Sequence, residues 1–247
     1  MSDVLLRCEN MAFGYAGRDP LAGEFQFELH GGEVVALMGE NGCGKSTLLR
    51  TFAGMIAPVS GNVELCSSPL ESWNARERAR RIALVRMSGI APERITVREF
   101  VSLGRSPYSG VFDSRSASDR SIVERAMDMT DVSAFAERPL SELSDGERSR
   151  VYLAEAVAQQ VKVLLLDEPN AFLDIPRSHA LFRMLRDLAE NRGMGIVVST
   201  HSIEYAERYC DRIMVVNAGT VSEAPASDAR KDGLFDWTEV TPRTGCP

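Results

Sequence analysis

The chain has 247 residues, of which 44% are hydrophobic and 26% are charged, so it contains enough apolar material for a domain with a sizeable core. Its formal net charge of -7 at pH 7 argues against a nucleic-acid binder that depends on contacts to phosphates. It contains no run of about 18 apolar residues, and its first residues lack the pattern of a signal peptide, so we expect no membrane span and no cleaved leader.

The first part of the chain predicts mainly strands. Apolar and polar residues alternate over 4–13 and 24–29, which predicts an antiparallel pair joined by a turn rich in Gly and Pro. The apolar run 33–38 predicts another strand, and a glycine-rich turn leads from it into a helical segment at 48–55. Two further strand candidates follow, at 61–66 and 81–87.

The middle of the chain predicts helices, and the last part returns to strands. Between about 88 and 158 the segments are helical and interrupted by Pro and Gly. Two short runs rich in Val, Leu and Ile, 161–169 and 193–201, then flank an amphipathic segment at 179–190. Because buried strands that alternate with helices form parallel sheets, this order predicts an α/β fold with a mostly parallel sheet and an inserted helical block.

The turn after the strand at 33–38 carries a phosphate-binding pattern. Residues 39–46 fit G-x-x-x-x-G-K-[ST] in the required strand–turn–helix setting. Glycines let backbone N–H groups close around a β-phosphate, Lys45 reaches the β- and γ-phosphates, and the Ser46 hydroxyl suits Mg²⁺. The residues expected to bind nucleotide here are Gly39, Glu40, Asn41, Gly42, Cys43, Gly44, Lys45, Ser46 and Thr47.

Acidic residues and a histidine follow two of the later strands. Asp167 ends the run 161–169 in a position to bind Mg²⁺, and Glu168 stands one residue further on, where it could polarise an attacking water. His201 closes the run 193–201, which predicts that it lies at the carboxyl edge of the sheet, where open α/β folds bind ligands.

The stretch LSDGE at 143–147 admits two interpretations. Ser144 is a natural N-cap, and Glu147 three residues later completes a capping box. A helix start with Gly146 and free N–H groups is also an anion site. The residues alone leave both alternatives open.

Cysteines and histidines are scattered along the chain. The number of cysteines is odd, at five, and their spacing is not that of a metal site, which indicates free thiols in a reducing cytosol. The three histidines are equally dispersed, which argues against a zinc site.

Taken together, the motifs resemble the ATP-binding subunit of ABC transporters. In that family the Walker A motif corresponds to 39–47, the Walker B motif to 163–168, the signature to 143–147 and the switch histidine to His201. Asn170–Asp174 resembles the loop that contacts the partner subunit, and Tyr15 falls where the family stacks an aromatic ring on adenine.

The resemblance implies a fold as well as an activity. It implies an α/β fold with a P-loop NTPase (RecA-like) core, an N-terminal antiparallel β subdomain and an inserted α-helical subdomain. We expect a single domain over 1–247, with the core at about 1–87 and 159–220, the helical subdomain at about 88–158 and a C-terminal tail at 221–247. The implied activity is ATP hydrolysis, with ATP and Mg²⁺ bound.

The resemblance also implies partners. In this family the signature helix points at the γ-phosphate of ATP held by a second copy, so Ser144, Gly146, Glu147 and Asp174 would complete a site in trans within a two-fold, head-to-tail dimer. The other implied partners are integral-membrane permease subunits and, indirectly, a substrate-binding protein, with no nucleic acid. The subunit would lie peripherally at the cytoplasmic face of the membrane.

Two longer stretches, 96–112 and 171–189, are most similar to importers of iron–siderophore, haem and cobalamin. Some residues depart from the family pattern: Asp145 replaces a Gly and Glu147 a Gln of the signature, and Met87 replaces a Gln that contacts Mg²⁺. Either another group substitutes for that Gln, or hydrolysis is slow until the permease docks. The alternatives to an importer ATPase are a soluble ABC-type ATPase and a nucleotide-gated regulator.

Overall fold

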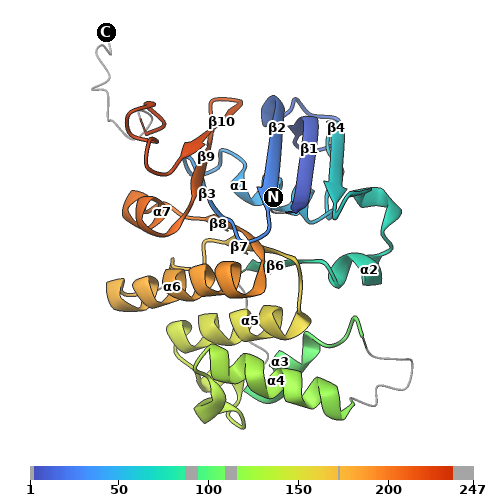
Figure 1. Ribbon diagram of the computed structural model, residues 1–247, viewed down its shortest axis with the longest axis vertical. Coiled ribbons are helices and arrows are strands. Elements are labelled where there is room, and N and C mark those ends of the chain that lie inside the picture. The colour runs from blue at the N-terminus through green and yellow to red at the C-terminus, as the bar shows by residue number, and fades with distance from the viewer. Residues whose placement is uncertain (1–2, 87–93, 109–115, 172, 236–247) are drawn as a thin grey trace.

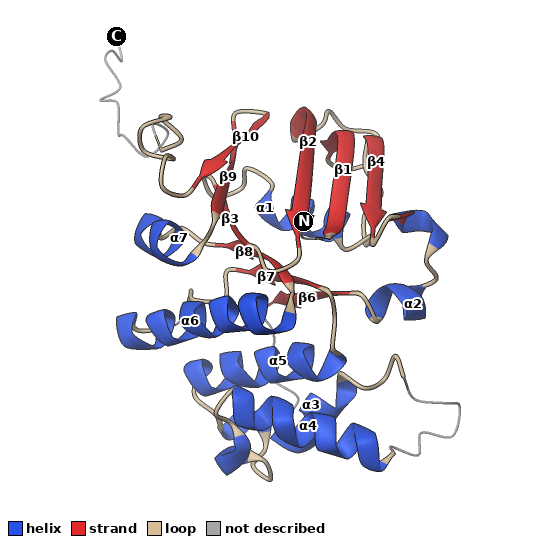
Figure 2. Cartoon of the chain, in the orientation of Figure 1, coloured by secondary structure: helices blue, strands red, loops and turns tan. Residues whose placement is uncertain are grey.

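The computed structural model describes residues 3–86, 94–108, 116–171 and 173–235 (Figure 1). Met87 therefore lies outside the described residues. Two sheets and three hydrophobic clusters organise the chain (Figure 2). Within the described part, no helix is both long and apolar enough to cross a lipid bilayer.

The first sheet is antiparallel and contains four strands in the order β2-β1-β4-β5. Its strands are β1 (Val4–Phe13), β2 (Ala22–His30), β4 (Ser60–Leu65) and the two-residue β5 (Ser68–Pro69). The alternating residues of β1 and β2 pair as expected, from Val4 opposite His30 to Phe13 opposite Ala22. The predicted antiparallel N-terminal pair is confirmed.

The second sheet contains six strands in the order β10-β9-β3-β8-β7-β6. Neighbouring strands are parallel except for β9 and β10. The strands are β3 (Val34–Met38), β6 (Ile82–Arg86), β7 (Val163–Asp167), β8 (Gly195–Ser199), β9 (Arg212–Asn217) and β10 (Thr220–Pro225). The predicted mostly parallel sheet is confirmed, and its short apolar strands are buried because both faces are covered.

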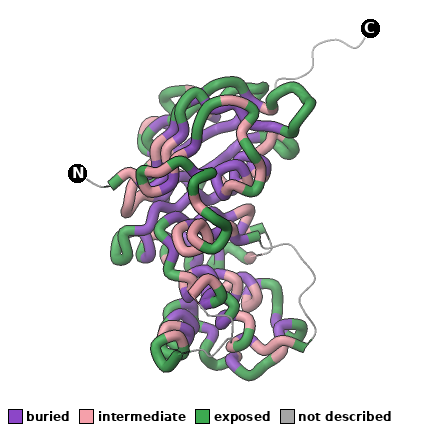
Figure 3. The backbone as a smooth tube through the Cα atoms, turned by 90° about the vertical axis from the view of Figure 1, so that its right-hand side faces the viewer, coloured by how far each residue is buried: buried purple, intermediate pink, exposed green. Residues whose placement is uncertain are grey.

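The two faces of this sheet pack against different layers. Along β3, Val35 and Leu37 belong to the cluster shared with the antiparallel sheet, whereas Val34, Ala36 and Met38 belong to the cluster on the opposite face. This alternation follows from the two-residue period of a strand. Figure 3 shows buried segments inside the upper part of the molecule with exposed segments around them, and further buried segments in the lower part.

Seven α-helices lie in the described residues. They are α1 (Lys45–Phe52), α2 (Ala75–Ala79), α3 (Val97–Leu103), α4 (Ala117–Met129), α5 (Asp145–Gln159), α6 (Ile175–Arg192) and α7 (Ile203–Tyr209). Short 3₁₀ turns occupy Leu70–Ser72, Ser133–Phe135 and Leu140–Glu142. Complete capping boxes start α2, α3, α4 and α5, which explains why these helices begin where they do.

Helices α3, α4 and α5 form the inserted helical subdomain in the lower half of Figure 1. Val151, Ala154 and Ala158 of α5 pack into the cluster of this subdomain, while Leu153 and Ala156 pack into the cluster under the six-stranded sheet. Helix α5 therefore joins the two parts of the molecule through its two apolar faces.

The sheet extends further along the chain than the sequence predicted. Residues 221–225, which we expect from the sequence to belong to a C-terminal tail, instead continue the sheet in β10, which pairs antiparallel with β9. Beyond it, Ala226, Ala229 and Phe235 are buried in the core. Small and apolar side chains in this segment thus contribute to packing.

Candidate functional site

The predicted site residues meet at the carboxyl edge of the six-stranded sheet. The glycine-rich loop follows β3, Asp167 ends β7, and Ser199 ends β8. Since the sheet order is β3-β8-β7, the three strand ends are neighbours. This edge is where open α/β sheets bind ligands.

The loop at 39–44 has the backbone geometry of an anion cradle. Gly39 has φ 141°, and a Cβ added there would lie 2.2 Å from the Val216 carbonyl oxygen, so only glycine fits. Gly44, with φ 111°, precedes α1, and its position provides no side-chain cap for the first N–H groups of that helix. Uncapped N–H groups with a positive dipole end fit a phosphate.

Lys45 lies under the loop with only 6% of its surface exposed. Its ammonium donates to the carbonyl oxygens of Gly39 at 2.8 Å and Glu40 at 2.9 Å. The cation is therefore held inside the curve of the loop that would surround a phosphate. Within the same loop, Cys43 is partly buried, and its Sγ lies 2.8 Å from the position of a Cβ on Gly39.

The turn after β1 lies against the loop and the start of α1. Tyr15 Oη lies 3.2 Å from Oγ1 of Thr47, and the Tyr15 residue is 43% exposed. Phe13 and Leu21 approach Gly44, where a Cβ would lie 3.0 Å from Phe13 Cε2. The structure thus places Tyr15 beside the loop, and its stacking on adenine stays a prediction.

The Asp167 carboxylate is held at the end of β7. Its Oδ1 accepts a hydrogen bond from the Ser199 hydroxyl at 3.1 Å, and Nε of Arg86 lies 4.0 Å from its Oδ2. Only 13% of its side chain is exposed. Ser46, its proposed partner in binding a metal, is partly buried near the start of α1.

Glu168 and His201 are joined directly. Oε1 of Glu168 lies 2.8 Å from Nε2 of His201, with 41% and 45% of the two side chains exposed. Glu168 has φ 51°, a left-handed conformation that few non-glycine residues adopt. The structure therefore brings both predicted catalytic residues together at an accessible edge of the sheet.

The start of α5 forms the predicted cap. The Ser144 N–H and hydroxyl donate to Oε2 of Glu147 at 2.8 and 2.7 Å, and the Glu147 N–H donates to the Ser144 Oγ at 3.4 Å. The hydrogen bonds from Ser144 lower the pKa of the Glu147 carboxyl. In Figure 1, α5 lies in the lower half and α1 in the upper half, so the cap and the loop lie apart within one chain.

The start of α5 also packs against the start of α6. A Cβ on Gly146 would lie 3.0 Å from Nη1 of Arg177 and 3.3 Å from Cδ2 of Leu173. Asp174 caps α6 by accepting the Arg177 N–H at 2.9 Å. Part of the segment 170–174, at position 172, lies outside the described residues.

Sequence reasoning missed two residues of this site. Ser199 and Thr200 are 0% and 1% exposed, and the Thr200 hydroxyl donates to Oδ1 of Asn170 at 3.3 Å. The signal available in the sequence was a pair of hydroxyl residues at the end of an apolar strand, directly before His201. Only the adjacent His201 was singled out from the sequence.

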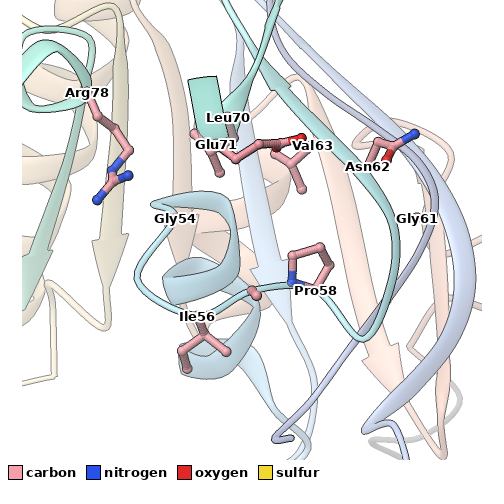
Figure 4. Close-up of a pocket in the computed structure, with 10 residues that line it drawn as sticks. Gly54, Ile56, Pro58, Gly61, Asn62, Val63, Leu70, Glu71 and Arg78 are labelled. Atoms are coloured by element: carbon pink, nitrogen blue, oxygen red, sulfur yellow. The ribbon is translucent and has the colours of Figure 1, made fainter. Parts of the chain in front are cut away.

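A cavity of about 450 Å³ lies elsewhere, beyond the opposite end of α1 (Figure 4). Its lining includes Ile56, Pro58, Leu70 and Arg78 and none of the predicted site residues. The site at the sheet edge is therefore separate from this cavity.

Comparisons with known proteins identify a family to which this chain is similar. The family model described as ABC transporter matches residues 23–171. The cobalamin import ATP-binding protein BtuD of Halobacterium salinarum is 40% identical over 195 residues, which cover 79% of this chain and 48% of that protein. The hemin import ATP-binding protein HmuV of Rhodococcus jostii is 38% identical over 233 residues, which cover 94% of this chain and 78% of that protein.

A solved structure agrees in fold. The dimeric post-hydrolysis state of the ATP-binding cassette MJ0796, bound to ADP and Pi, matches with a TM-score of 0.79 and 25% identity, over 90% of this chain and 99% of that one. The chain spans about half the length (48%) of the Halobacterium relative. Since the family model matches more than half of the chain, the chain belongs to the ABC transporter family.

Proposed function

We propose that the chain binds and hydrolyses ATP and powers an ABC importer. The observation that carries this proposal is the meeting of three elements at one sheet edge: the loop that holds Lys45, the partly buried Asp167, and the Glu168–His201 pair. A phosphate cradle beside a carboxylate pair is an arrangement that suits phosphoryl transfer to water, because it can hold the phosphates, a metal ion and the attacking water together.

The residues present fit a nucleotide and a metal ion. Lys45 and the uncapped N–H groups of α1 would hold the phosphates, and Tyr15 would contact the base. Ser46 and Asp167 offer the oxygen ligands that Mg²⁺ prefers. When bound, this ion would neutralise charge that develops on the phosphate oxygens.

Glu168 and His201 have roles of their own in the proposed reaction. The Glu168 carboxylate would orient a water molecule and accept its proton, a role that contributes about 10²–10⁴-fold in typical enzymes. His201 would hold that carboxylate through the contact of 2.8 Å. Before the reaction, His201 would thus restrict the rotation of the Glu168 side chain.

A second copy would complete the site. Ser144, Gly146 and Glu147 start α5 away from their own loop, so the positive end of this helix could face a phosphate held by a partner. Asp174 and the start of α6 pack beside them and would contact the same partner. The relative bound to ADP and Pi is a dimer, which supports this arrangement.

The cargo class proposed is an iron chelate, haem or cobalamin. Relatives named for cobalamin import and hemin import support it. The chain would act at the cytoplasmic face of the membrane with permease subunits and, through them, a substrate-binding protein. A soluble ABC-type ATPase or a nucleotide-gated regulator is the alternative outcome of the test.

The test first asks whether neighbouring open reading frames encode a permease, and then reconstitutes the chain with that permease. We expect ATP hydrolysis by the complex in lipid vesicles and uptake of one cargo from a panel of ferric siderophores, hemin and cobalamin. The complex with Lys45→Ala is the control and is expected to show neither. If the chain hydrolyses ATP but binds no permease and supports no uptake, the result would favour the soluble ATPase. If it binds ATP but does not hydrolyse it, the result would favour the regulator.

A further inference from the structure

Ser199 lies between the two halves of the proposed site. It is the last residue of β8, the strand between β3 and β7. Ser199 pairs with Leu37 of β3, and the preceding Val198 pairs with Leu166 of β7. Its fully buried side chain (0% exposed) is therefore flanked by the strand that leads into the loop and the strand that ends in the acidic pair.

The Ser199 hydroxyl uses both its donor and its acceptor capacity. It donates to Oδ1 of Asp167 at 3.1 Å and accepts the backbone N–H of Glu168 at 2.8 Å. One oxygen atom thus ties the side chain of the first acid to the main chain of the second. An alanine at this position would remove the partner from both groups.

The main chain of Glu168 is the part of the site that most needs such a constraint. With φ 51°, it occupies the left-handed region, which a residue with a Cβ keeps only when its surroundings hold it there. This conformation sets the direction in which the Glu168 carboxylate leaves β7 toward His201. The bond from its N–H to Ser199 acts directly on that conformation.

We propose that Ser199 is a positioning residue for ATP hydrolysis, whose hydroxyl aims both Asp167 and Glu168. The role rests on the proposed function, because it concerns the same reaction at the same edge. Among the described residues, the hydrogen bonds of the Ser199 hydroxyl go to the two acids, whereas those of the Lys45 ammonium go to carbonyl oxygens of the loop. Ser199 therefore affects turnover more than nucleotide binding.

The first test is Ser199→Ala in the reconstituted complex, with Ser102→Ala as the matched control. Ser102 is also a buried serine (5% exposed), and its hydroxyl donates to the Arg98 carbonyl within α3. We expect Ser199→Ala to lower kcat by about 10–100-fold, the usual effect of losing a group that orients a ligand. KM for ATP should stay within about two-fold, and Ser102→Ala should match the wild type.

A second readout needs no nucleotide. In hydrogen–deuterium exchange of the isolated chain, we expect the Glu168 amide to exchange faster in Ser199→Ala than in the wild type or Ser102→Ala. On a Glu168→Gln background, Ser199→Ala should lower kcat by a smaller factor than it does in the wild type, because the part of its effect that acts through the Glu168 carboxylate is already lost.

Conservative variants separate positioning from packing. Ser199→Thr keeps the hydroxyl, so we expect it to retain most of the wild-type kcat. Ser199→Cys keeps the size but has a weak donor, so it should lose activity as Ser199→Ala does. If Ser199→Ala does not fold, this pair decides the question.

Different outcomes contradict the two proposals. A hydrolysing wild type with unchanged kcat and unchanged Glu168 exchange in Ser199→Ala would overturn the role of Ser199 alone. Equal kcat in Ser199→Thr and Ser199→Cys would overturn it too. A wild-type complex that does not hydrolyse ATP would overturn the proposed function and this role with it.

Discussion

Oε1 of Glu168 and Nε2 of His201 lie 2.8 Å apart across the ends of two adjacent parallel strands. The two residues are separated by 33 positions in the sequence, so their contact depends on the register between β7 and β8. Because the pair is partly exposed, it can meet both a water molecule and a bound phosphate. It provides the most direct test of the proposed chemistry.

Glu168→Gln should abolish most hydrolysis while it preserves binding. Glutamine keeps the size and one oxygen acceptor but removes the base, so we expect kcat to fall by about 10²–10⁴-fold. The affinity for ATP, measured by fluorescent-nucleotide titration, should stay within a few-fold of the wild type. Equal loss of affinity and turnover would instead assign Glu168 to binding.

His201→Ala should lower kcat by less than Glu168→Gln does, because the histidine acts by holding the acid. The kcat of His201→Gln, which can still hydrogen-bond Glu168, should lie between the kcat of His201→Ala and that of the wild type. Combined with Glu168→Gln, His201→Ala should add little, since both changes remove one interaction. Fully additive losses in steady-state kinetics would show that His201 contacts the substrate independently.

Lys45→Ala should remove nucleotide binding. The buried ammonium, held by Gly39 and Glu40, is the point cation for the phosphates. The control is Lys231→Ala, whose exposed side chain pairs with Asp228 on the surface. In equilibrium titrations with ATP, we expect binding to be lost in the first variant and unchanged in the second.

Glu155 on α5 predicts a pH dependence of stability. Burial raises the pKa of its carboxyl from 4.5 to about 7. Between these values the folded chain keeps a proton that the unfolded chain has lost, so the free energy of unfolding falls as pH rises through this window. Glu155→Gln removes this titration and should therefore stabilise the fold above pH 7, by about 1–3 kcal/mol.

Thermal unfolding at several pH values checks this expectation. The Tm of Glu155→Gln should exceed that of the wild type at pH 8, and the difference should shrink toward pH 4. Glu137→Gln is the control, because its side chain is 78% exposed and pairs with Arg98. If the Tm of Glu155→Gln and the Tm of the wild type change with pH in parallel, the raised pKa of Glu155 would be contradicted.

The sequence predicted the parts of the site that depend on local spacing. The glycine loop could be recognised because Gly39, Gly44 and Lys45 stand at fixed distances along the chain, and the central strands because they are continuous apolar runs. Helix α2 was not predicted, because it has five residues and none of them is buried, so no apolar period marks it.

Contacts between distant segments could not be predicted in the same way. The hydroxyl of Ser199 meets Asp167, which lies 32 positions earlier, only because β7 and β8 are adjacent in one register. The approach of Gly146 to Arg177 likewise depends on how α5 packs against α6. No local pattern specifies either contact. The same argument applies to β10, whose residues SEAP do not form an apolar run.

The start of α5 supplies the last prediction, which concerns the dimer. If Glu168→Gln stalls the reaction, ATP should hold two copies together, and a species of twice the monomer mass should accumulate with ATP and vanish with ADP. Adding Ser144→Arg should abolish that species. A bulky cation would replace the hydroxyl that bonds Glu147 and would fill the place proposed for the partner's γ-phosphate.

The cap itself must be separated from the phosphate contact. Ser116 starts α4 with the same capping box, in which its hydroxyl donates to Asp119 at 2.7 Å. Ser116→Arg should therefore cost a similar helix cap, about 1 kcal/mol, and leave the ATP-dependent dimer intact. Light scattering at high protein concentration, or on the assembled complex, measures the ATP-dependent dimer in both variants.

If Ser144→Arg and Ser116→Arg leave the dimer equally intact, Ser144 is only a helix cap. If both abolish it, loss of a cap alone accounts for the effect, and the site in trans loses its support.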